Sequence, residues 1–476
     1  MTTENIPPSK SAGRSQDIFA ADQTFASLGL SEPILRAITE RGYVHPTRIQ
    51  ADLIPIVLSG KDCLGQAKTG TGKTAAFALP ALHMIPKDSA LSVLILVPTR
   101  ELAIQVAKEI SEFAKFSGHQ VVPIYGGQPI STQVQKLQRG PAIIVGTPGR
   151  VMDLHERRVL SYENIRYAVL DEVDRMLDMG FAADIDSIVQ ETPHNRQTLL
   201  FSATYPENIE ALSRQYQNNP VSIRVESLHT AHTIQQQFIE CDRDDRLGAL
   251  ERALAHFGIQ QAVIFCNTKQ TTHEVCTHLR DLGYSALGLH GDLEQKDRDR
   301  VLVRFRQGSL AILVATDVAA RGLDVDDLPA VINYELPRDA EVYVHRIGRT
   351  GRAGKEGLAL SLTTNKEGYK RDAIAEQIGQ KVNSMNADDL STVPADIERP
   401  EWITLALAAG RRHKMRPGDV LGALTKNGGI TGAEVGKIDV LEQVTYVAVK
   451  RNACNAALQH LENTPIKGKN VRSRKA

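Results

Sequence analysis

Short apolar runs alternate with helical patterns twice along the chain. In the first half these runs are residues 62–67, 93–99, 142–147, 167–172 and 198–204. In the second half they are residues 263–268, 311–317, 330–336 and 357–363. Runs this apolar, separated by helices, are typical of parallel strands that are buried on both faces. The pattern predicts two α/β domains with parallel sheets, at 23–225 and 234–380, joined by a polar linker at 226–233.

Residues 401–476 follow a different pattern. It predicts strands at 402–409, 435–441, 444–450 and 470–474, with helices at 418–426 and 452–461. The order βαββαβ is that of a small ferredoxin-like sandwich, as in an RNA-recognition-motif-like domain. A polar stretch with two prolines, 381–400, predicts a second linker, and residues 1–22 predict a flexible tail.

Charge is balanced overall but not along the chain. The 476 residues include 56 basic and 56 acidic side chains, yet residues 401–476 hold 13 Lys or Arg against 6 Asp or Glu. A basic module on a mildly acidic body favours a polyanionic partner, although a solvated charged face would look the same. Five separated cysteines without a C-x-x-C pair predict reduced thiols in the cytoplasm. No apolar run approaches the roughly 18 residues of a membrane span, so we expect no membrane partner.

A glycine-rich segment lies between a predicted strand and a predicted helix. It reads Ala67, Lys68, Thr69, Gly70, Thr71, Gly72, Lys73, Thr74. Such a loop turns its backbone N–H groups toward a polyphosphate, and this predicts a phosphate-binding site. Lys73 would reach the β- and γ-phosphates, and Thr74 would ligate Mg²⁺.

Carboxylates follow the predicted strand at 167–172. Asp171 would hold the Mg²⁺ shell, and Glu172 would orient and deprotonate the attacking water. Acidic residues at this place also suit a plain helix N-terminus. The phosphate loop upstream favours the catalytic interpretation.

These motifs, in this order, resemble the DEAD-box family of ATP-dependent RNA helicases over about residues 25–365. The resemblance implies two RecA-like domains and one ATP, with RNA gripped by its backbone without regard to sequence. It adds to the ATP site Phe25, Thr47, Gln50, Gly322 and Asp324. It implies RNA contacts at Arg100, Gly127, Thr147, Arg150, Arg298 and Thr316. It implies that hydrolysis is coupled to strand separation through Asp174, Ser202, Thr204 and His345.

The resemblance also implies arginine fingers. In the segment His345 to Arg352, Arg349 and Arg352 would contact the γ-phosphate and complete a catalytic set with Lys73 and Glu172. ATP and single-stranded RNA would each favour closure of the two domains, and closure would bend one strand locally. One departure is visible, because Val173 stands where the family has Ala. Its two extra methyls could slow turnover by overpacking.

The C-terminal module has poor support for base stacking on its sheet, because only Tyr446 matches a stacking aromatic. We expect Trp402 to be a packing residue. The candidate RNA contacts are basic residues in two segments: Arg411, Arg412, Lys414, Arg416, Lys467, Lys469 and Arg472.

The module resembles the C-terminal domain of one bacterial branch of the family. That branch implies binding to a hairpin of large-subunit ribosomal RNA in pre-ribosomal particles, and a role in large-subunit assembly. Cold-shock helicases carry similar modules. A general RNA remodeller, an RNA-binding scaffold with weak ATPase and a DNA helicase stay open as alternatives. No obligate protein partner is expected.

Overall fold

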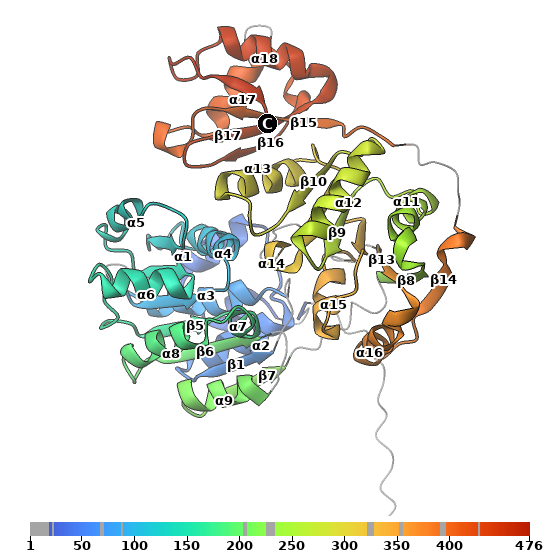
Figure 1. Ribbon diagram of the computed structural model, residues 1–476. Coiled ribbons are helices and arrows are strands. Elements are labelled where there is room, and N and C mark those ends of the chain that lie inside the picture. Colours follow the sequence, from blue (N-terminus) through green and yellow to red (C-terminus); the bar gives the residue numbers. More distant parts are fainter. Residues whose placement is uncertain are drawn as a thin grey trace, which may run out of the picture. The chain divides into compact units, whose positions relative to one another are not determined.

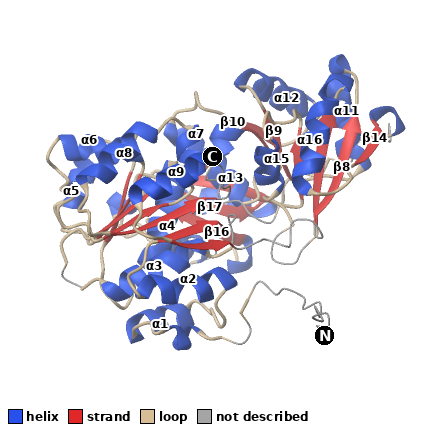
Figure 2. Ribbon diagram, turned by 90° about the horizontal axis from the view of Figure 1, so that it is seen from below, coloured by secondary structure: helices blue, strands red, loops and turns tan. Residues whose placement is uncertain are grey.

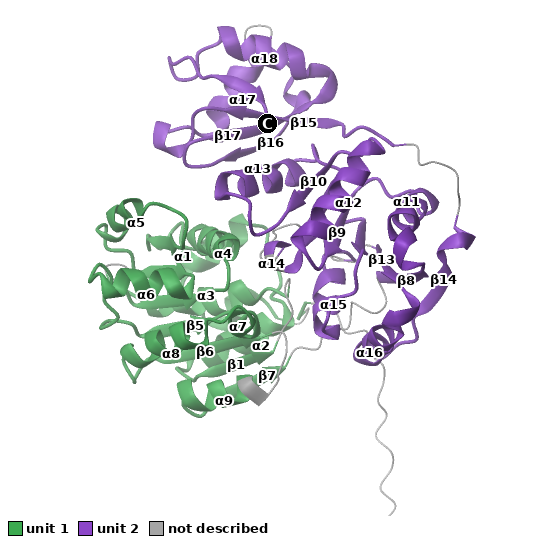
Figure 3. Cartoon of the chain, viewed as in Figure 1, with its two compact units in different colours: residues 1–228 green, residues 229–476 purple. Residues whose placement is uncertain are grey.

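The computed structural model describes residues 19–20, 23–66, 71–86, 89–202, 207–224, 234–320, 328–351, 356–390, 397–426 and 429–476. The chain divides into two compact units, residues 1–228 and 229–476 (Figure 3). The expected tail at 1–22, apart from Phe19 and Ala20, and the expected linker at 226–233 lie outside the described residues. Within the described residues, no helix has the length and apolar character needed to cross a bilayer.

A seven-stranded parallel sheet forms the centre of the first unit, in the order β3-β4-β2-β5-β6-β1-β7. Its strands are β1 (Cys63–Gln66), β2 (Val93–Leu96), β3 (Val121–Ile124), β4 (Ile143–Gly146), β5 (Tyr167–Leu170), β6 (Gln197–Ser202) and β7 (Val221–Arg224). The five central strands are the five apolar runs expected from the sequence. The edge strands β3 and β7 are partly exposed, and neither was among the expected runs.

Helices cover both faces of this sheet (Figure 2). They are α1 (Glu32–Glu40), α2 (Arg48–Leu58), α3 (Lys73–Met84), α4 (Arg100–Phe113), α5 (Ile130–Leu137), α6 (Pro148–Glu156), α7 (Val173–Asp178), α8 (Ala182–Glu191) and α9 (Glu207–Tyr216). On one face of the sheet, helices α1, α2, α3 and α4 pack in one core cluster. On the other face, helices α6, α7, α8 and α9 pack in a second cluster. Burial on both faces explains why the central strands are almost wholly apolar.

The second unit begins with another seven-stranded parallel sheet, in the order β10-β11-β9-β12-β13-β8-β14. Its strands are β8 (Ile234–Glu240), β9 (Ala262–Cys266), β10 (Ala286–Leu289), β11 (Ile312–Thr316), β12 (Ala330–Asn333), β13 (Gly357–Thr363) and β14 (Asn383–Asn386). Its helices are α11 (Arg246–His256), α12 (Lys269–Asp281), α13 (Gln295–Arg306), α14 (Asp317–Ala320), α15 (Ala340–Ile347) and α16 (Gly368–Ile378).

The expectation of a linker throughout 381–400 was wrong, because β14 pairs with β8 inside that range. A strand at the edge of a sheet pairs with one neighbour only and leaves its other edge open, so it can be polar. Residues 391–396 lie outside the described residues.

The C-terminal domain has an antiparallel sheet in the order β16-β17-β15-β18, with α17 and α18 packed on one face (Figure 1). Its elements are β15 (Trp402–Leu407), α17 (Pro417–Thr425), β16 (Val435–Val440), β17 (Thr445–Lys450), α18 (Cys454–Asn463) and β18 (Ser473–Lys475). This confirms the expected βαββαβ order. Trp402 packs its ring against Gly436, where an added Cβ would lie 2.8 Å from a ring carbon.

The opposite face of this sheet is covered within the same unit by the end of α13. Gln307 donates to Asp439 (2.9 Å) and to the Tyr446 carbonyl (3.3 Å) and accepts from Thr404 (2.9 Å). The hydroxyls of Ser309 and Thr404 lie 2.6 Å apart. Tyr446 is 7% exposed, so the expected weakness of sheet-face base stacking has a structural reason: the face is occupied.

Candidate active site

Lys73 is a buried cation at the first turn of α3. Residues 67–70 of the phosphate loop lie outside the described residues, and β1 ends just before them. Lys73 is 6% exposed, and its Nζ has no hydrogen-bond partner among the described residues. The nearest carboxylate oxygen, on Asp171, is 3.7 Å away. A buried ammonium without a hydrogen bond is costly, and a phosphate would satisfy it.

Asp171 and Glu172 lie directly after β5. Burial raises the pKa of Asp171, while the Lys73 ammonium and the Glu172 backbone N–H oppose that rise. The Glu172 N–H donates to Asp171 Oδ1 at 3.0 Å. Glu172 itself has a left-handed backbone, φ 54°, which is rare for a residue with a side chain. Strained backbones of this kind gather at active sites.

Hard oxygen ligands are available for Mg²⁺ in this arrangement. Thr74 follows Lys73 at the start of α3, and the Asp171 carboxylate lies beside Lys73. Mg²⁺ usually takes one or two protein oxygens together with substrate phosphates and water. Among the described residues, no three or more His, Cys, Asp or Glu side chains are grouped so that they could hold a metal ion.

Gln50 joins the expected adenine-reading element to the phosphate loop. Its Nε2 donates to the Gly72 carbonyl (3.1 Å), and its Oε1 accepts from the Thr47 N–H (2.9 Å). Gly72 has φ 90°, and a side chain there would overlap the Gln50 amide. The glycine is therefore required both by the backbone conformation and by this close approach.

Phe25, the expected stacking aromatic, is 4% exposed and belongs to the core cluster of the first domain. Its contact with the adenine base stays a prediction.

The expected RNA contacts of the first domain gather at one edge of its sheet. Arg100 begins α4, and its guanidinium lies where a side chain on Gly127 would project. Thr147 is the N-cap of α6, and Arg150 donates to the Gln128 carbonyl at 3.1 Å. These residues follow β2, β3 and β4, which are neighbours in the parallel sheet, so the strands deliver them to the same edge.

The coupling residues are only partly described. Ser202 ends β6 and is 1% exposed, and Asp174 lies in the first turn of α7. Thr204 lies outside the described residues. Val173, between Glu172 and Asp174, is 0% exposed and packs in the core below the carboxylates.

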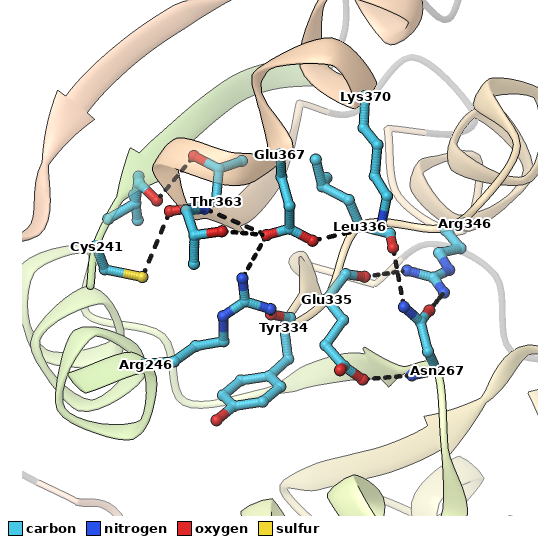
Figure 4. Close-up of polar contacts among 12 residues, drawn as sticks. Cys241, Arg246, Asn267, Tyr334, Glu335, Leu336, Arg346, Thr363, Glu367 and Lys370 are labelled. Carbon is cyan, nitrogen blue, oxygen red and sulfur yellow. Dashed lines mark hydrogen bonds and ion pairs between the residues drawn. The ribbon is translucent and has the colours of Figure 1, made fainter. Parts of the chain in front are cut away.

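The second domain contains a polar centre around Arg346 that sequence reasoning missed; Figure 4 shows its contacts with Glu335 and Asn267. Arg346 is 2% exposed. Its Nε and Nη2 each donate to Asp317 at 2.7 Å. The remaining donors reach the Asn333 side chain (3.1 Å), the Glu335 carbonyl (2.7 Å) and the Asn267 side chain (3.0 Å). One guanidinium therefore ties together segments after β9, β11 and β12.

The expected arginine finger Arg349 lies one helical turn beyond this centre. Its N–H donates to the Arg346 carbonyl (3.2 Å), and its carbonyl accepts from the Leu328 N–H (3.1 Å). His345 lies on α15 in the preceding turn. Arg352, Gly322 and Asp324 lie outside the described residues.

Arg298 and Thr316, the expected RNA contacts of this domain, lie near one another. Arg298 on α13 donates to the Ala319 carbonyl at 3.4 Å, and Thr316 ends β11 just before α14. Asp317, the next residue, pairs with Arg346. The RNA-contact segment and the finger segment are thus bonded to each other inside this domain.

The basic residues of the C-terminal domain lie in two exposed segments, and the structure brings those segments together. The seven residues Arg411, Arg412, Lys414, Arg416, Lys467, Lys469 and Arg472 are all exposed. The Lys467 ammonium donates to the Lys414 carbonyl (2.6 Å) and pairs with Asp419 (2.7 Å).

Comparisons with known proteins agree with this architecture. The family models "DEAD/DEAH box helicase", "Helicase conserved C-terminal domain" and "DbpA RNA binding domain" match residues 47–212, 245–354 and 404–475. ATP-dependent RNA helicase DbpA of Escherichia coli is 46% identical over 455 residues, which cover 94% of this chain and 99% of the relative. DEAD-box helicase CshA of Bacillus cereus is 44% identical over 370 residues, 77% of this chain and 70% of the relative.

Solved structures give the same result. Dbp5 of S. cerevisiae, bound to RNA and ADP BeF3, has a TM-score of 0.69 and 30% identity, covering 77% of this chain and 96% of that one. The chain belongs to the family of DEAD-box ATP-dependent RNA helicases, and it carries a DbpA-type RNA-binding domain at its C-terminal end.

Proposed function

We propose that this helicase separates short RNA duplexes in large-subunit ribosomal RNA during ribosome assembly, and that its C-terminal domain directs it to a hairpin of the peptidyl-transferase region. The observation that carries the proposal is the pair of joined basic loops in a domain that matches the DbpA RNA-binding domain. Phosphate contacts supply affinity, while base contacts supply specificity. Because α13 covers the sheet face, we assign RNA binding to these loops.

The first domain would supply the chemistry of ATP hydrolysis. The Lys73 ammonium would take the β- and γ-phosphates as its missing partners, and Gln50 would read adenine. Thr74 and Asp171 would hold Mg²⁺, which neutralises phosphate charge when bound. Glu172 would orient the attacking water and accept its proton.

The second domain would supply charge stabilisation and RNA contact. We assign Arg349 and Arg352 to the γ-phosphate, and Arg298 and Thr316 to the RNA backbone. RNA and ATP would each favour closure of the domains, as ligands favour the state that they bind better. The remaining backbone contacts, Arg100, Gly127, Thr147 and Arg150, would grip the same strand.

Steady-state ATPase activity tests this proposal. Full-length protein is assayed with three activators at equal nucleotide concentration: a ribosomal RNA fragment with the peptidyl-transferase hairpin, poly-uridine and single-stranded DNA. We expect strong preference for the fragment. Equal activation by both RNAs would replace ribosomal targeting with general RNA remodelling, and activation by DNA would remove the RNA assignment.

A loop variant provides the control. Deletion of residues 401–476 would uncover the buried Gln307, so point substitutions are preferable. Lys469→Met with Arg472→Met removes two exposed cations. We expect this variant to keep activation by poly-uridine and to lose the preference for the ribosomal fragment.

A further inference from the structure

Lys467 occupies a turn position that lysine does not favour. Ile466 and Lys469 exchange backbone hydrogen bonds of 2.9 and 3.1 Å around the turn. The two central residues, Lys467 and Gly468, have φ 51° and 74°. Positive φ at both central positions is the pattern of a type I′ turn, where Asn-Gly is preferred. Lysine in this conformation costs backbone free energy that Asn or Gly would not, so the contacts of its side chain are of interest.

The Lys467 side chain is exposed, but its ammonium is held by other groups of the same domain. It donates to the Lys414 carbonyl at 2.6 Å and pairs with an Asp419 oxygen at 2.7 Å. The same Asp419 oxygen accepts from the Arg416 N–H at 2.7 Å and so closes the start of α17. Lys414 also has a left-handed backbone, φ 59°. Lys467 thus joins two strained turns from different parts of the domain.

The loop 411–416 is fixed at its other end by the turn between β16 and β17. The Arg411 N–H donates to the Leu441 carbonyl (2.8 Å), and the Arg412 N–H donates to the Glu442 carbonyl (3.0 Å). The contact from Lys467 fixes the far end, at Lys414. Together these bonds set the spacing between the two basic loops.

Lys469, two residues away, differs from Lys467. Its side chain is exposed, and its ammonium has no hydrogen bond or ion pair among the described residues. Its charge is available to a ligand, while the charge of Lys467 is largely cancelled by Asp419. The two lysines of this turn therefore differ: Lys469 is open to a ligand, and Lys467 is bonded to Asp419 and to the Lys414 carbonyl.

We propose that Lys467, with Asp419 and the Lys414 carbonyl, is a clamp that positions the two basic loops for an RNA phosphate backbone, and that Lys467 is not itself a phosphate ligand. The proposal rests on the RNA-binding role proposed above for this domain. Holding both loops in their bound arrangement removes an ordering cost that RNA binding would otherwise bear. It revises the expectation that Lys467 contacts RNA directly.

Salt dependence separates a clamp from a phosphate contact. Affinity falls with salt concentration along a line whose slope counts the phosphates neutralised. Loss of one phosphate-binding lysine reduces this slope by about 1. Loss of a positioning residue weakens binding and leaves the slope unchanged.

The experiment measures fluorescence anisotropy of full-length protein with the ribosomal hairpin fragment across a range of KCl concentrations. Lys467→Asn suits the left-handed turn, so we expect an unchanged or higher melting temperature. We expect affinity about tenfold weaker at physiological salt, from loss of an ordered loop, with the wild-type slope. Lys469→Asn is the matched control, with a slope lower by about 1.

For Asp419→Asn, the clamp and a purely electrostatic effect predict changes in RNA affinity of opposite sign. If charge alone mattered, removal of an acidic group from a basic surface would tighten RNA binding. The clamp predicts weaker binding, because Lys467 loses its ionic partner. Tighter binding by Asp419→Asn, or a lower slope for Lys467→Asn, would overturn the clamp.

The clamp and the underlying function fail in different ways. Wild-type affinity for Lys467→Asn, with a reduced slope for Lys469→Asn, would remove the clamp and keep RNA binding by the loops. No effect of Lys469→Asn and no salt-dependent binding by the wild type would remove the proposed function and the clamp with it.

Discussion

Lys73 in the first α/β domain and Arg346 in the second are both buried cations beside an aspartate, yet their surroundings differ. Lys73 lies 3.7 Å from Asp171 and has no hydrogen-bond partner among the described residues. Arg346 donates to both oxygens of Asp317 at 2.7 Å and to three further acceptors. The first pair is incomplete, and the second is saturated.

The difference separates a ligand site from a scaffold. A buried polar group without partners costs stability, and it persists where a ligand supplies the missing bonds. A saturated buried network instead fixes the segments that it connects. Substitution at Lys73 should therefore affect activity more than stability, and substitution at Arg346 should affect both.

The largest expected effect is at the saturated centre. Arg346→Met leaves Asp317 and two asparagines without their donor, and removal of one partner of a buried pair costs about 3–5 kcal/mol. Denaturant unfolding measures this loss. Lys73→Met is the matched control; it should abolish ATPase activity with a much smaller stability change, since the Lys73 ammonium has no hydrogen bond among the described residues to lose and lies 3.7 Å from Asp171. Equal destabilisation by both variants would end the comparison.

The second-largest expected effect is on the rate of ATP hydrolysis, at Glu172 beside the Lys73–Asp171 pair. Glu172→Gln keeps the side chain's shape and removes the proposed base. We expect kcat lower by about a thousandfold, or about 4 kcal/mol of barrier, with ATP binding and melting temperature unchanged. Single-turnover hydrolysis and nucleotide titration measure the two quantities. Retained turnover would take Glu172 out of the base role.

Much of the fold was predictable because burial marks the central strands. All five inner strands of the first sheet appeared as apolar runs, while the edges β3 and β7 did not. In the second sheet β10, β8 and β14 were missed. β8 has three consecutive glutamines, and β14 has the sequence Asn-Ser-Met-Asn. Polarity hides β8 and β14, whereas β3 and β10 are apolar but contain Pro123 and Gly288, residues that weaken a strand pattern.

The site was predictable where its parts are local in sequence. Asp171 follows β5 directly, and Lys73 begins α3, separated from β1 by residues 67–72, so each motif carries its own structural context. The role of Arg346 depends on acceptors from three separate strand ends, which no local pattern shows. Lys467 looked like one of several surface cations because its partner Asp419 is distant in sequence. Long-range partners decide these roles.

A smaller effect is expected at Val173, beneath the carboxylates. Its side chain is 0% exposed and packs in the core cluster on that face. Val173→Ala restores the family residue and removes two methyl groups, at a cost of about 2 kcal/mol. We expect kcat to change little. Thermal unfolding and ATPase assays measure both; faster turnover with unchanged stability would mean that Val173 is overpacked.

The smallest effect is expected at Gln50, which belongs to the incomplete site but already has partners. Its amide bonds to Gly72 and Thr47, so it links the adenine reader to the phosphate loop before nucleotide binds. Gln50→Ala should weaken ATP about tenfold, the value of one good hydrogen bond, and leave GTP affinity nearly unchanged. Titration with fluorescent ATP and GTP analogues measures both. Equal loss for the two nucleotides would mean that Gln50 acts through the loop and does not read the base, which would move it from the ligand site to the scaffold.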